Sequence, residues 1–478
     1  MKIKALELEN FRCFDSFAIN FSDQFNIHAI IAENMVGKSA LMHALKLTAN
    51  TYTSGLRTET QIRKEDHRVI GNNPMSDITS NVSIKAEALI TDAEGRQVLS
   101  SWRKYKEKPV GGYTKLQILS GIDPKKQSVK TYDSSQQEGG AILPLFSFIG
   151  TEYIHVESSE TLNWEINGKS IDAYKDCFED KSIKKYLFNW LKKIDNIIIE
   201  SNHKKIIFEA YQDIPLKALQ AFQQAVISVL PDIIAIEWSN DAKQPIVKLC
   251  NGDIRLFDML SDGYRYLITL AGELATRSFL LNKRQDDILN KIYGVVIIDE
   301  FGIHLHPALQ NDSLIRLGKT FPNVQFIITT HSPLILNGLK KEQVHVLSID
   351  SNGKRISANP DEDVIGMGAD QIITKIFGLS TTLDKEYLKL SEEYKQLFSK
   401  KEAGQLSKEE EESFKELSGK LAYYRLDPQH KVGEEDTLTT LVKEQLGKQE
   451  VNNLTAGEAE ELNKTVGDII DKIFNKKS

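Results

Sequence analysis

The chain has 478 residues, of which 41% are hydrophobic, and its formal net charge at pH 7 is −7. This length allows two or three domains or one large domain with an appendage, and the negative charge argues against non-specific attraction to nucleic acid. The chain lacks a run of about 18 apolar residues, a signal-peptide pattern and closely spaced cysteines, so we expect a cytoplasmic protein without a membrane span, zinc site or disulfide framework.

The first 50 residues predict strands that lead into a phosphate-binding turn. Residues 2–8 alternate as in a strand, and residues 17–21 follow with a second such pattern. Residues 25–31 form a continuous apolar run, which is typical of a buried strand, and residues 39–47 have a helical pattern. A strand, a turn and a helix in this order are the context that a phosphate-binding loop requires.

The segment from about 50 to 255 has a mixed pattern and is interpreted as an insertion. It contains a predicted strand over 82–90, a helical region over about 172–230 and two short strands over 233–238 and 245–249. No heptad run long enough for a coiled-coil arm interrupts it.

The pattern of a buried core resumes near residue 257. A helical pattern is followed by two continuous apolar runs, 294–298 and 324–328, and by a further strand over 344–347. These runs predict that the core sheet of the first segment continues here.

The last part of the chain, from about residue 383, is predicted to be helical. Apolar stripes within 387–397 and 414–424 flank a glycine-containing break, and Ser407 with Glu410 has the spacing of a capping box. These features predict a helical hairpin, and residues 462–473 add a last amphipathic segment.

The first motif that carries chemistry is the turn after the first buried run. It reads Ala-Glu-Asn-Met-Val-Gly-Lys-Ser over residues 32–39 and fits GxxxxGK[ST], except that Ala32 replaces the first glycine. Backbone N–H groups of such a loop point at phosphate oxygens, Lys38 would reach the β- and γ-phosphates of ATP, and the Ser39 hydroxyl would bind Mg²⁺. A chance turn is the alternative, but the strand before it and the helix after it favour the phosphate site. The candidate nucleotide-binding residues of this loop are Asn34, Val36, Gly37, Lys38, Ser39 and Ala40.

A second motif ends the apolar run 295–298 with two acidic residues, Asp299 and Glu300. A carboxylate at this place would hold Mg²⁺, and the next would orient the attacking water or accept its proton. A strand that simply ends in solvated acids is common, but the matching loop upstream favours Asp299 as a metal ligand and Glu300 as a catalytic residue.

Two further motifs are weaker when taken alone. Residues 260–265 read Leu-Ser-Asp-Gly-Tyr-Arg, in which Ser261 and Gly263 at a helix start suit a γ-phosphate, although a plain helix cap would look the same. His331 follows the run 324–328 and would sense the γ-phosphate, although a lone histidine is more often structural.

The order of these motifs resembles the RecF/SMC-like branch of ABC-type ATPases, which serves in DNA repair and anti-phage defence. The opening Asn-Phe-Arg, with Arg12, resembles that family's start, where the arginine touches nucleotide, and the segment 300–307 resembles its loop after the acidic pair. His304 and His306 in this segment are interpreted as dimer-interface residues rather than metal ligands.

This resemblance implies an α/β fold: an ABC-type P-loop NTPase core with a mixed sheet, a helical insertion and a helical C-terminal extension. We expect an ATPase domain over residues 1–382, with its insertion at about 50–255, and a helical region over 383–478 that binds partners or forms oligomers. ATP with Mg²⁺ would lie between Lys38 of one copy and Ser261 of another, so a homodimer or higher homo-oligomer is implied.

A narrower resemblance follows residue 367. Residues 368–373 and 377–380 resemble the C-terminal half of PtuA, the ATPase of Septu and of some retron defence systems. This implies an HNH nuclease of the PtuB type as a partner, and it leaves DNA, and a retron reverse transcriptase with its DNA, open as further partners. Ala32 and Met35 stand where the family has glycine, so slow hydrolysis is expected.

Two other functions remain as alternatives. A RecF-like DNA-repair ATPase would bind DNA, and the basic stretches 102–106 and 181–193 could serve it, although solvated faces are the favoured interpretation. An ATP-dependent nuclease of the OLD type needs an acidic cluster with strand-end Glu and paired Asp, which the acids at 350 and 361–363 do not reproduce.

Overall fold

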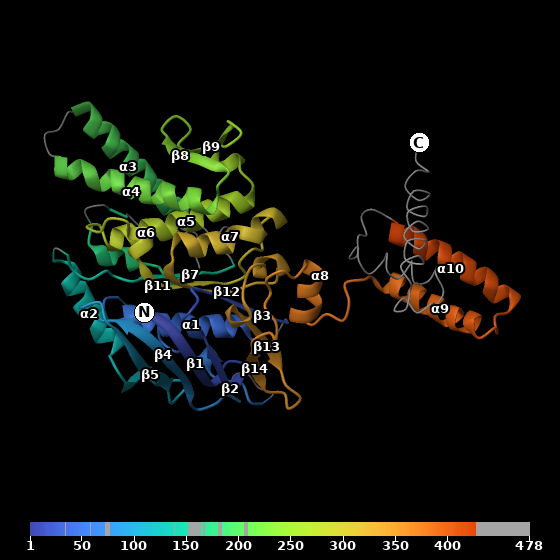
Figure 1. Cartoon of the computed structure of the whole chain (residues 1–478). Coiled ribbons are helices and arrows are strands. Elements are labelled where there is room, and N and C mark those ends of the chain that lie inside the picture. Colours follow the sequence, from blue (N-terminus) through green and yellow to red (C-terminus); the bar gives the residue numbers. More distant parts are fainter. Residues whose placement is uncertain are drawn as a thin grey trace, which may run out of the picture. The chain divides into compact units, whose positions relative to one another are not determined.

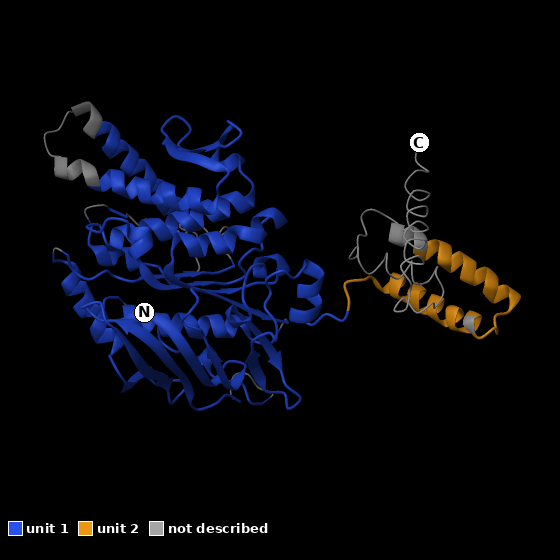
Figure 2. Ribbon diagram, viewed as in Figure 1, with its two compact units in different colours: residues 1–380 blue, residues 381–478 orange. Residues whose placement is uncertain are grey.

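The computed structural model describes residues 1–33, 35–57, 59–71, 77–137, 139–151, 164–165, 168–179, 184–204 and 209–426. The chain separates into two compact units, Met1–Ser380 and Thr381–Ser478 (Figure 2). Each unit is described by itself.

A six-stranded sheet forms the centre of the first unit, with the order β14-β13-β3-β12-β11-β7 (Figure 1). All neighbouring strands are parallel except β14, which runs antiparallel to β13 at one edge. Every residue of β3 is buried, because helices or strands cover both faces of a parallel sheet, and this explains its continuous apolar run. The strands are β3 (Ile27–Ala32), β7 (Leu145–Ile149), β11 (Tyr293–Ile298), β12 (Asn323–Thr329), β13 (Val344–Ile349) and β14 (Arg355–Ala358).

A second, antiparallel sheet has the order β2-β1-β4-β5-β6. Its strands alternate buried and exposed side chains, as expected for a sheet that packs on one face only. Helix α1 (Lys38–Thr53) contacts β3 and β11 of the central sheet and β4 of this one, so it lies between the two sheets (Figure 1). The strands are β1 (Lys2–Phe11), β2 (Phe14–Asn20), β4 (Val82–Thr91), β5 (Gln97–Lys106) and β6 (Lys115–Ser120).

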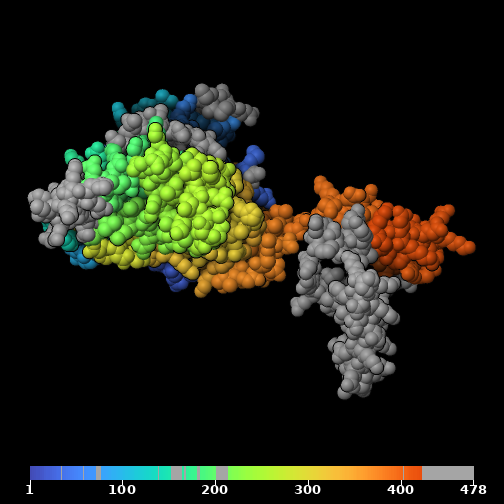
Figure 3. Space-filling model, turned by 90° about the horizontal axis from the view of Figure 1, so that it is seen from above, coloured from blue at the N-terminus to red at the C-terminus, as the bar shows by residue number. Residues whose placement is uncertain are grey.

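Helices cover the other face of the central sheet. Helix α5 (Asp262–Leu281) contacts β7, α4 (Glu209–Val229) contacts α5 and α7 (Pro307–Thr320), and α3 (Lys184–Lys204) contacts both α4 and α5. Seen from above, the segment from α3 to the small sheet forms much of the surface of this unit (Figure 3). The remaining elements of the unit are α2 (Pro124–Ser135), α6 (Ile288–Lys291), α8 (Ala369–Gln371) and the small sheet β8 (Ile233–Ser239), β9 (Gln244–Leu249) and β10 (Ile254–Leu256).

The interface of α5 with the insertion contains a buried ion pair. Arg277 and Glu273 on α5 lie 2.7 Å apart, and both side chains are almost fully inaccessible to solvent. The Arg277 guanidinium also donates to the carbonyls of Ala173 and Lys175 and lies 5.1 Å from the centroid of a Trp164 ring. A buried charge needs partners on every side, so this cluster fixes the segment around residue 174 against α5.

One sequence interpretation is wrong in part. The basic stretch 102–106 was expected to be a solvated face, but it lies in β5, where Lys104 and Lys106 are buried with 1% and 8% of their surface exposed. Lys104 donates to the carbonyl of Thr60 and pairs with Glu59, and Lys106 donates to the carbonyl of Ile62. The two lysines therefore hold the segment after α1 on the antiparallel sheet. In the second stretch, the three lysines at 185, 192 and 193 are exposed, as expected.

The described part of the second unit is a helical hairpin of α9 (Lys385–Glu402) and α10 (Lys408–Leu426), as the sequence predicts. The capping box is confirmed, because Ser407 Oγ accepts from the Glu410 N–H and the Glu410 carboxylate accepts from the Ser407 N–H. The rings of Tyr394 and Phe414 stack across the hairpin at 5.0 Å. The predicted amphipathic segment 462–473 lies outside the described residues.

Among the described residues, no helix is both long and apolar enough to cross a membrane.

Candidate nucleotide-binding site

The phosphate-binding loop joins β3 to α1. Ala32 is the last residue of β3, Gly37 precedes the first residue of α1 with φ 123°, and Met35 has φ 67°. The side chain of Met35 is 93% exposed, whereas that of Val36 is buried. Asn34, a predicted nucleotide ligand, lies outside the described residues. Among the described residues of the loop, Met35 and Gly37 have positive φ angles, so one of these conformations is held without a glycine.

Lys38 lies at the N-terminus of α1 and its ammonium group faces the ends of the neighbouring strands. It donates to the Ala32 carbonyl at 3.2 Å and contacts the ring of His331, which follows β12. Burial lowers the pKa of Lys38, while the carboxylates of Glu300 and Asp299 oppose that shift. Burial and then Lys38 lower the pKa of His331, which favours the neutral ring that can accept a hydrogen bond from the ammonium group.

The acidic pair follows β11 and is held by a threonine that the sequence analysis did not single out. Thr329 Oγ1 donates to Asp299 Oδ1 at 2.5 Å and accepts from the Glu300 N–H at 2.7 Å. Glu300 has φ 54°, so its backbone turns away from the strand directly after Asp299. Burial raises the pKa of Asp299 despite the Thr329 hydrogen bond, as expected for a carboxylate whose counter-charge is a bound cation.

The loop after the acidic pair, residues 300–306 and here called the D-loop, is bonded to the loop that carries His331. Gln310 on α7 donates to the carbonyls of Gly302 and Leu305, and its side-chain oxygen accepts from Ser332 Oγ at 2.6 Å. Thr330 Oγ1 donates to the Phe301 carbonyl at 2.8 Å. The two loops therefore move together if either moves.

Ser261 and Gly263 begin α5, as predicted. Ser261 is the N-cap residue and is exposed, but its side chain makes no capping hydrogen bond. A Cβ atom at Gly263 would lie 3.1 Å from the His304 carbonyl oxygen, so the start of α5 packs directly on the D-loop. The hydroxyl of Ser261 is not used to cap its own helix, which leaves it able to bind a ligand.

Arg12 pairs with Asp66 in this structure rather than with the phosphate-binding loop. Its guanidinium lies 2.8 Å from Asp66 Oδ1, and His43 on α1 lies 3.2 Å from the same oxygen. Burial would raise the pKa of Asp66, but His43, the Arg63 N–H group and Arg12 together lower it to about 2. Arg12 thus fixes the end of β1 beside α1, and its contact with nucleotide stays a prediction.

The oxygen ligands of the site suit Mg²⁺. The Asp299 carboxylate and the Ser39 hydroxyl are hard donors of the type that Mg²⁺ uses together with substrate phosphates and water. In the part of the chain that the structure describes, no group of three or more His, Cys, Asp or Glu side chains could enclose a metal ion. His306 caps α7 by accepting from the Ala308 N–H, and His304 lies near the Tyr266 ring.

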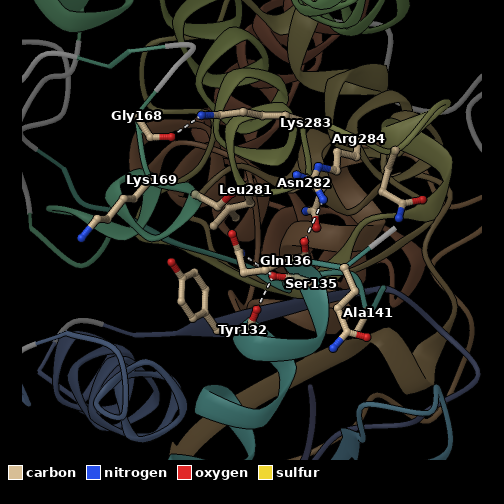
Figure 4. A pocket seen from close by; sticks show the side chains of 13 residues that line it. Tyr132, Ser135, Gln136, Ala141, Gly168, Lys169, Leu281, Asn282, Lys283 and Arg284 are labelled. Carbon is tan, nitrogen blue, oxygen red and sulfur yellow. Dashed lines mark hydrogen bonds between the residues drawn. The ribbon is translucent and has the colours of Figure 1, made fainter. Parts of the chain in front are cut away.

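A separate cavity of about 350 Å³ lies between the C-terminal ends of α2 and α5 (Figure 4). None of its lining residues belongs to the four motifs. Lys283 donates to the Gly168 carbonyl and Arg284 to the Gln136 carbonyl, so these cations satisfy main-chain oxygens and offset the negative ends of two helices. The cavity therefore lies where the C-terminal ends of α2 and α5 meet the segment around residue 168, and hydrogen bonds across it hold these segments together.

Family models match most of the first unit. A model described as an AAA domain matches residues 5–223, and one described as "AAA domain, putative AbiEii toxin, Type IV TA system" matches residues 175–337. The chain is 23% identical to the retron Ec83 probable ATPase of Escherichia coli, over 85% of this chain and 82% of that protein. It is 25% identical to the retron Vc95 probable ATPase of Vibrio cholerae, over 83% of each chain. A Septu protein PtuA of Bacillus mycoides is 30% identical over 42% of this chain and 27% of the relative.

With its phosphate-binding loop, acidic pair and histidine at the ends of adjacent parallel strands, the first unit has the α/β fold of a P-loop NTPase, and both matching family models describe an AAA domain. Over most of its length the chain is similar to the probable ATPases of two retrons, and over a shorter stretch it is similar to the Septu protein PtuA.

Proposed function

We propose that this chain binds ATP with Mg²⁺ and acts as the nucleotide-controlled subunit of an anti-phage defence complex. The observation that supports it best is the meeting of Lys38, Asp299 and His331 at the carboxyl ends of β3, β11 and β12, which are neighbours in the sheet. Such an edge is where open α/β sheets bind their ligands.

Each group of the site has a distinct task. The N–H groups of Val36 to Ala40 bind the phosphates at the N-terminus of α1, and Lys38 leaves the His331 ring to meet the β- and γ-phosphates. Asp299 and Ser39 would hold Mg²⁺, which would neutralise phosphate charge when bound. Glu300 orients the attacking water and accepts its proton.

A head-to-tail dimer would complete the site. The exposed Ser261 hydroxyl and the N-terminus of α5 would supply the γ-phosphate contacts of the opposite copy. Three large apolar side chains on the motif loops are exposed, Met35 at 93%, Met259 at 67% and Ile303 at 62%. Apolar groups exposed beside three different motifs support burial by a second copy when ATP closes the dimer.

The nuclease partner is inferred from the relatives. The similarity to Septu PtuA supports an HNH nuclease of the PtuB type, and the similarity to the retron ATPases keeps a reverse transcriptase and its DNA as an alternative partner. The helical region 383–478 is the proposed dock. If a variant that ends at residue 433 still binds the nuclease, residues 434–478 are not the dock.

The rival functions are less well supported. The acids at 350 and 363 accept hydrogen bonds from backbone N–H groups, and Glu362 pairs with Lys375, so these residues have structural tasks rather than those of a nuclease centre. A RecF-like clamp is favoured only by the exposed lysines of α3.

The experiment that tests the proposal uses the purified chain with Glu300→Gln. We expect the variant to bind ATP as the wild type does and to lower turnover by about 100-fold, the usual contribution of a general base. Wild-type protein that binds no ATP would remove the proposal, and unaltered turnover in the variant would remove the role of Glu300. Purification with the products of neighbouring genes then decides the partner: a bound HNH nuclease supports the defence complex, whereas ATP-dependent DNA binding by the chain alone supports the clamp.

A further inference from the structure

Arg355 makes one hydrogen bond to the phosphate-binding loop and one to a neighbouring turn, although it lies far from both in the sequence. It is the first residue of β14, the antiparallel edge strand of the central sheet (Figure 1). Its Nε donates to the Val36 carbonyl and its Nη1 donates to the Cys13 carbonyl, each at 2.8 Å. The guanidinium therefore bridges the phosphate-binding loop and the turn between β1 and β2.

The Val36 carbonyl is a group whose direction matters. In a phosphate-binding loop the N–H groups point inward to the phosphate oxygens, so the intervening carbonyls must point outward and find other donors. Val36 stands between Met35, with φ 67°, and Gly37, with φ 123°. A hydrogen bond that fixes the Val36 carbonyl fixes the peptide whose N–H belongs to Gly37.

The opposite side of the loop is braced by packing. A Cβ atom at Gly37 would lie 2.7 Å from Cys13 Sγ and 2.9 Å from Phe14 Cζ, and Phe14 itself is buried. The side chains of Cys13 and Phe14 therefore leave no room for a side chain at residue 37. Arg355 links the Cys13 carbonyl of the same turn to the Val36 carbonyl of the loop. The planar guanidinium can hold both carbonyls at once, which a lysine ammonium on a flexible stem does less well.

The positive φ of Met35 shows why such a brace is needed. A left-handed conformation is strained for a residue with a side chain, and it persists only when its surroundings hold it. Ala32 and Met35 stand where the resembled family has glycine, so this loop cannot reach the phosphate-binding conformation as freely as a glycine-rich one.

We infer that Arg355 is a positioning residue for nucleotide binding, which holds the Val36–Gly37 peptide in the conformation that presents its N–H to phosphate. It acts through the Val36 carbonyl and does not itself contact the nucleotide. The inference rests on the proposed binding of ATP at this loop.

The test measures ATP affinity of the full-length chain by calorimetry for Arg355→Met and Arg355→Lys. We expect Arg355→Met to weaken binding by about tenfold or more, because two charge-assisted hydrogen bonds to the loop and its brace are lost. Arg355→Lys keeps the charge but not the two-carbonyl bridge, and we expect it to recover only part of the affinity. If Arg355→Lys binds ATP with the full wild-type affinity, the bridge between the two carbonyls is not needed and only the positive charge matters.

A double-mutant cycle separates positioning from general stability. In a Met35→Gly background the loop needs less support, so we expect Arg355→Met to cost several-fold less affinity than it does in the wild type. An equal loss in both backgrounds would contradict the inference. Arg316→Met is the matched control, because Arg316 pairs with Asp312 on α7, and it should leave affinity unchanged.

The outcomes separate the two proposals. Wild-type protein that fails to bind ATP would remove the proposed function, whereas wild-type and Arg355→Met proteins that bind ATP equally would remove this inference alone. If Arg355→Met does not fold, Arg355→Lys and its cycle with Met35→Gly still decide it.

Discussion

Met35 is the residue at which this phosphate-binding loop differs most in its physical properties from a glycine-rich one. It combines a positive φ with an almost fully exposed thioether side chain. Its positive φ is a strained conformation for a residue with a side chain, and its exposure places it where the opposite copy of the proposed dimer would approach.

The first prediction follows from this strain. Replacing Met35 with glycine should tighten ATP binding several-fold, since the bound loop requires a conformation that glycine adopts without cost. Calorimetric titration of the full chain measures the change. Met259→Ala removes another exposed methionine and should leave the affinity of a monomer unchanged; equal effects of the two changes would attribute the result to lost apolar surface instead.

The second prediction concerns the charge at the phosphates. Lys38→Ala should abolish detectable ATP binding, because it removes the ammonium group that contacts His331 here and would contact the β- and γ-phosphates. Lys46→Ala, further along α1, is the control on the same helix. Binding that persists in calorimetry for Lys38→Ala would show that the nucleotide lies elsewhere.

At the scale of elements, apolar periodicity predicted β3, β11, β12, β13 and the helix after the loop, because burial on both faces of the sheet leaves long hydrophobic runs. It did not predict the two edge strands, β7 and β14. The sequence did not reveal the residues whose side chains bond to groups far away in the chain. Thr329, Gln310 and Arg355 are ordinary polar residues until the fold brings a carbonyl or carboxylate to them. For the same reason the lysines of β5 were misinterpreted, since their burial depends on carbonyls of a separate segment.

A third prediction uses Gln310, which joins the D-loop to the loop of His331. Gln310→Leu should lower ATP turnover by roughly tenfold with little change in ATP affinity. A leucine can neither donate to the carbonyls of Gly302 and Leu305 nor accept from Ser332 Oγ, so the two loops lose the hydrogen bonds that Gln310 makes between them. Gln343→Leu, which removes a buried glutamine bond at the other end of β3, should affect stability rather than turnover. Weakened ATP binding with normal turnover would contradict the coupling role of Gln310.

A fourth prediction concerns two histidines buried beside Phe21, one on β3 and one on β13. His28 and His345 lie 3.3 Å apart between ring nitrogens, and burial lowers the pKa of His28 to about 3 and that of His345 to about 4. Since both folded-state pKa values lie below the unfolded value of about 6.5, their stabilising contribution is complete above pH 6.5 and is lost as the pH falls toward 4.

At pH 5 this loss should be on the order of 2 kcal/mol for each histidine. Urea denaturation of the wild type and of His345→Gln at pH 7 and pH 5 measures it, and the variant should lose less stability on acidification. The exposed His306→Gln serves as control and should behave as the wild type does. Equal acid sensitivity of wild type and His345→Gln would mean that other groups control the pH dependence.

At the scale of the whole molecule, the proposed site is divided between copies, so the assembly should depend on nucleotide. We expect the Glu300→Gln chain to change from monomer to dimer when ATP and Mg²⁺ are added, as measured by analytical ultracentrifugation. Adding Ser261→Arg should prevent this change while ATP still binds, because the larger side chain blocks the start of α5.

Ser351→Arg places the same side chain on the exposed turn between β13 and β14 and should leave the dimer intact. A Ser261→Arg chain that still dimerises with ATP would show that the N-terminus of α5 is not at the interface.

The bridge from Arg355 to the loop near residue 36 has a consequence for how the protein is made. A ribosome synthesises the loop early and β14 more than 300 residues later, and the Arg355 side chain joins the two. A nascent chain would therefore leave the ribosome with its nucleotide loop unbraced until almost the whole first unit had emerged. ATP could then be captured with full affinity only by a completed unit, so that truncated chains released from the ribosome would bind nucleotide more weakly than the finished protein does.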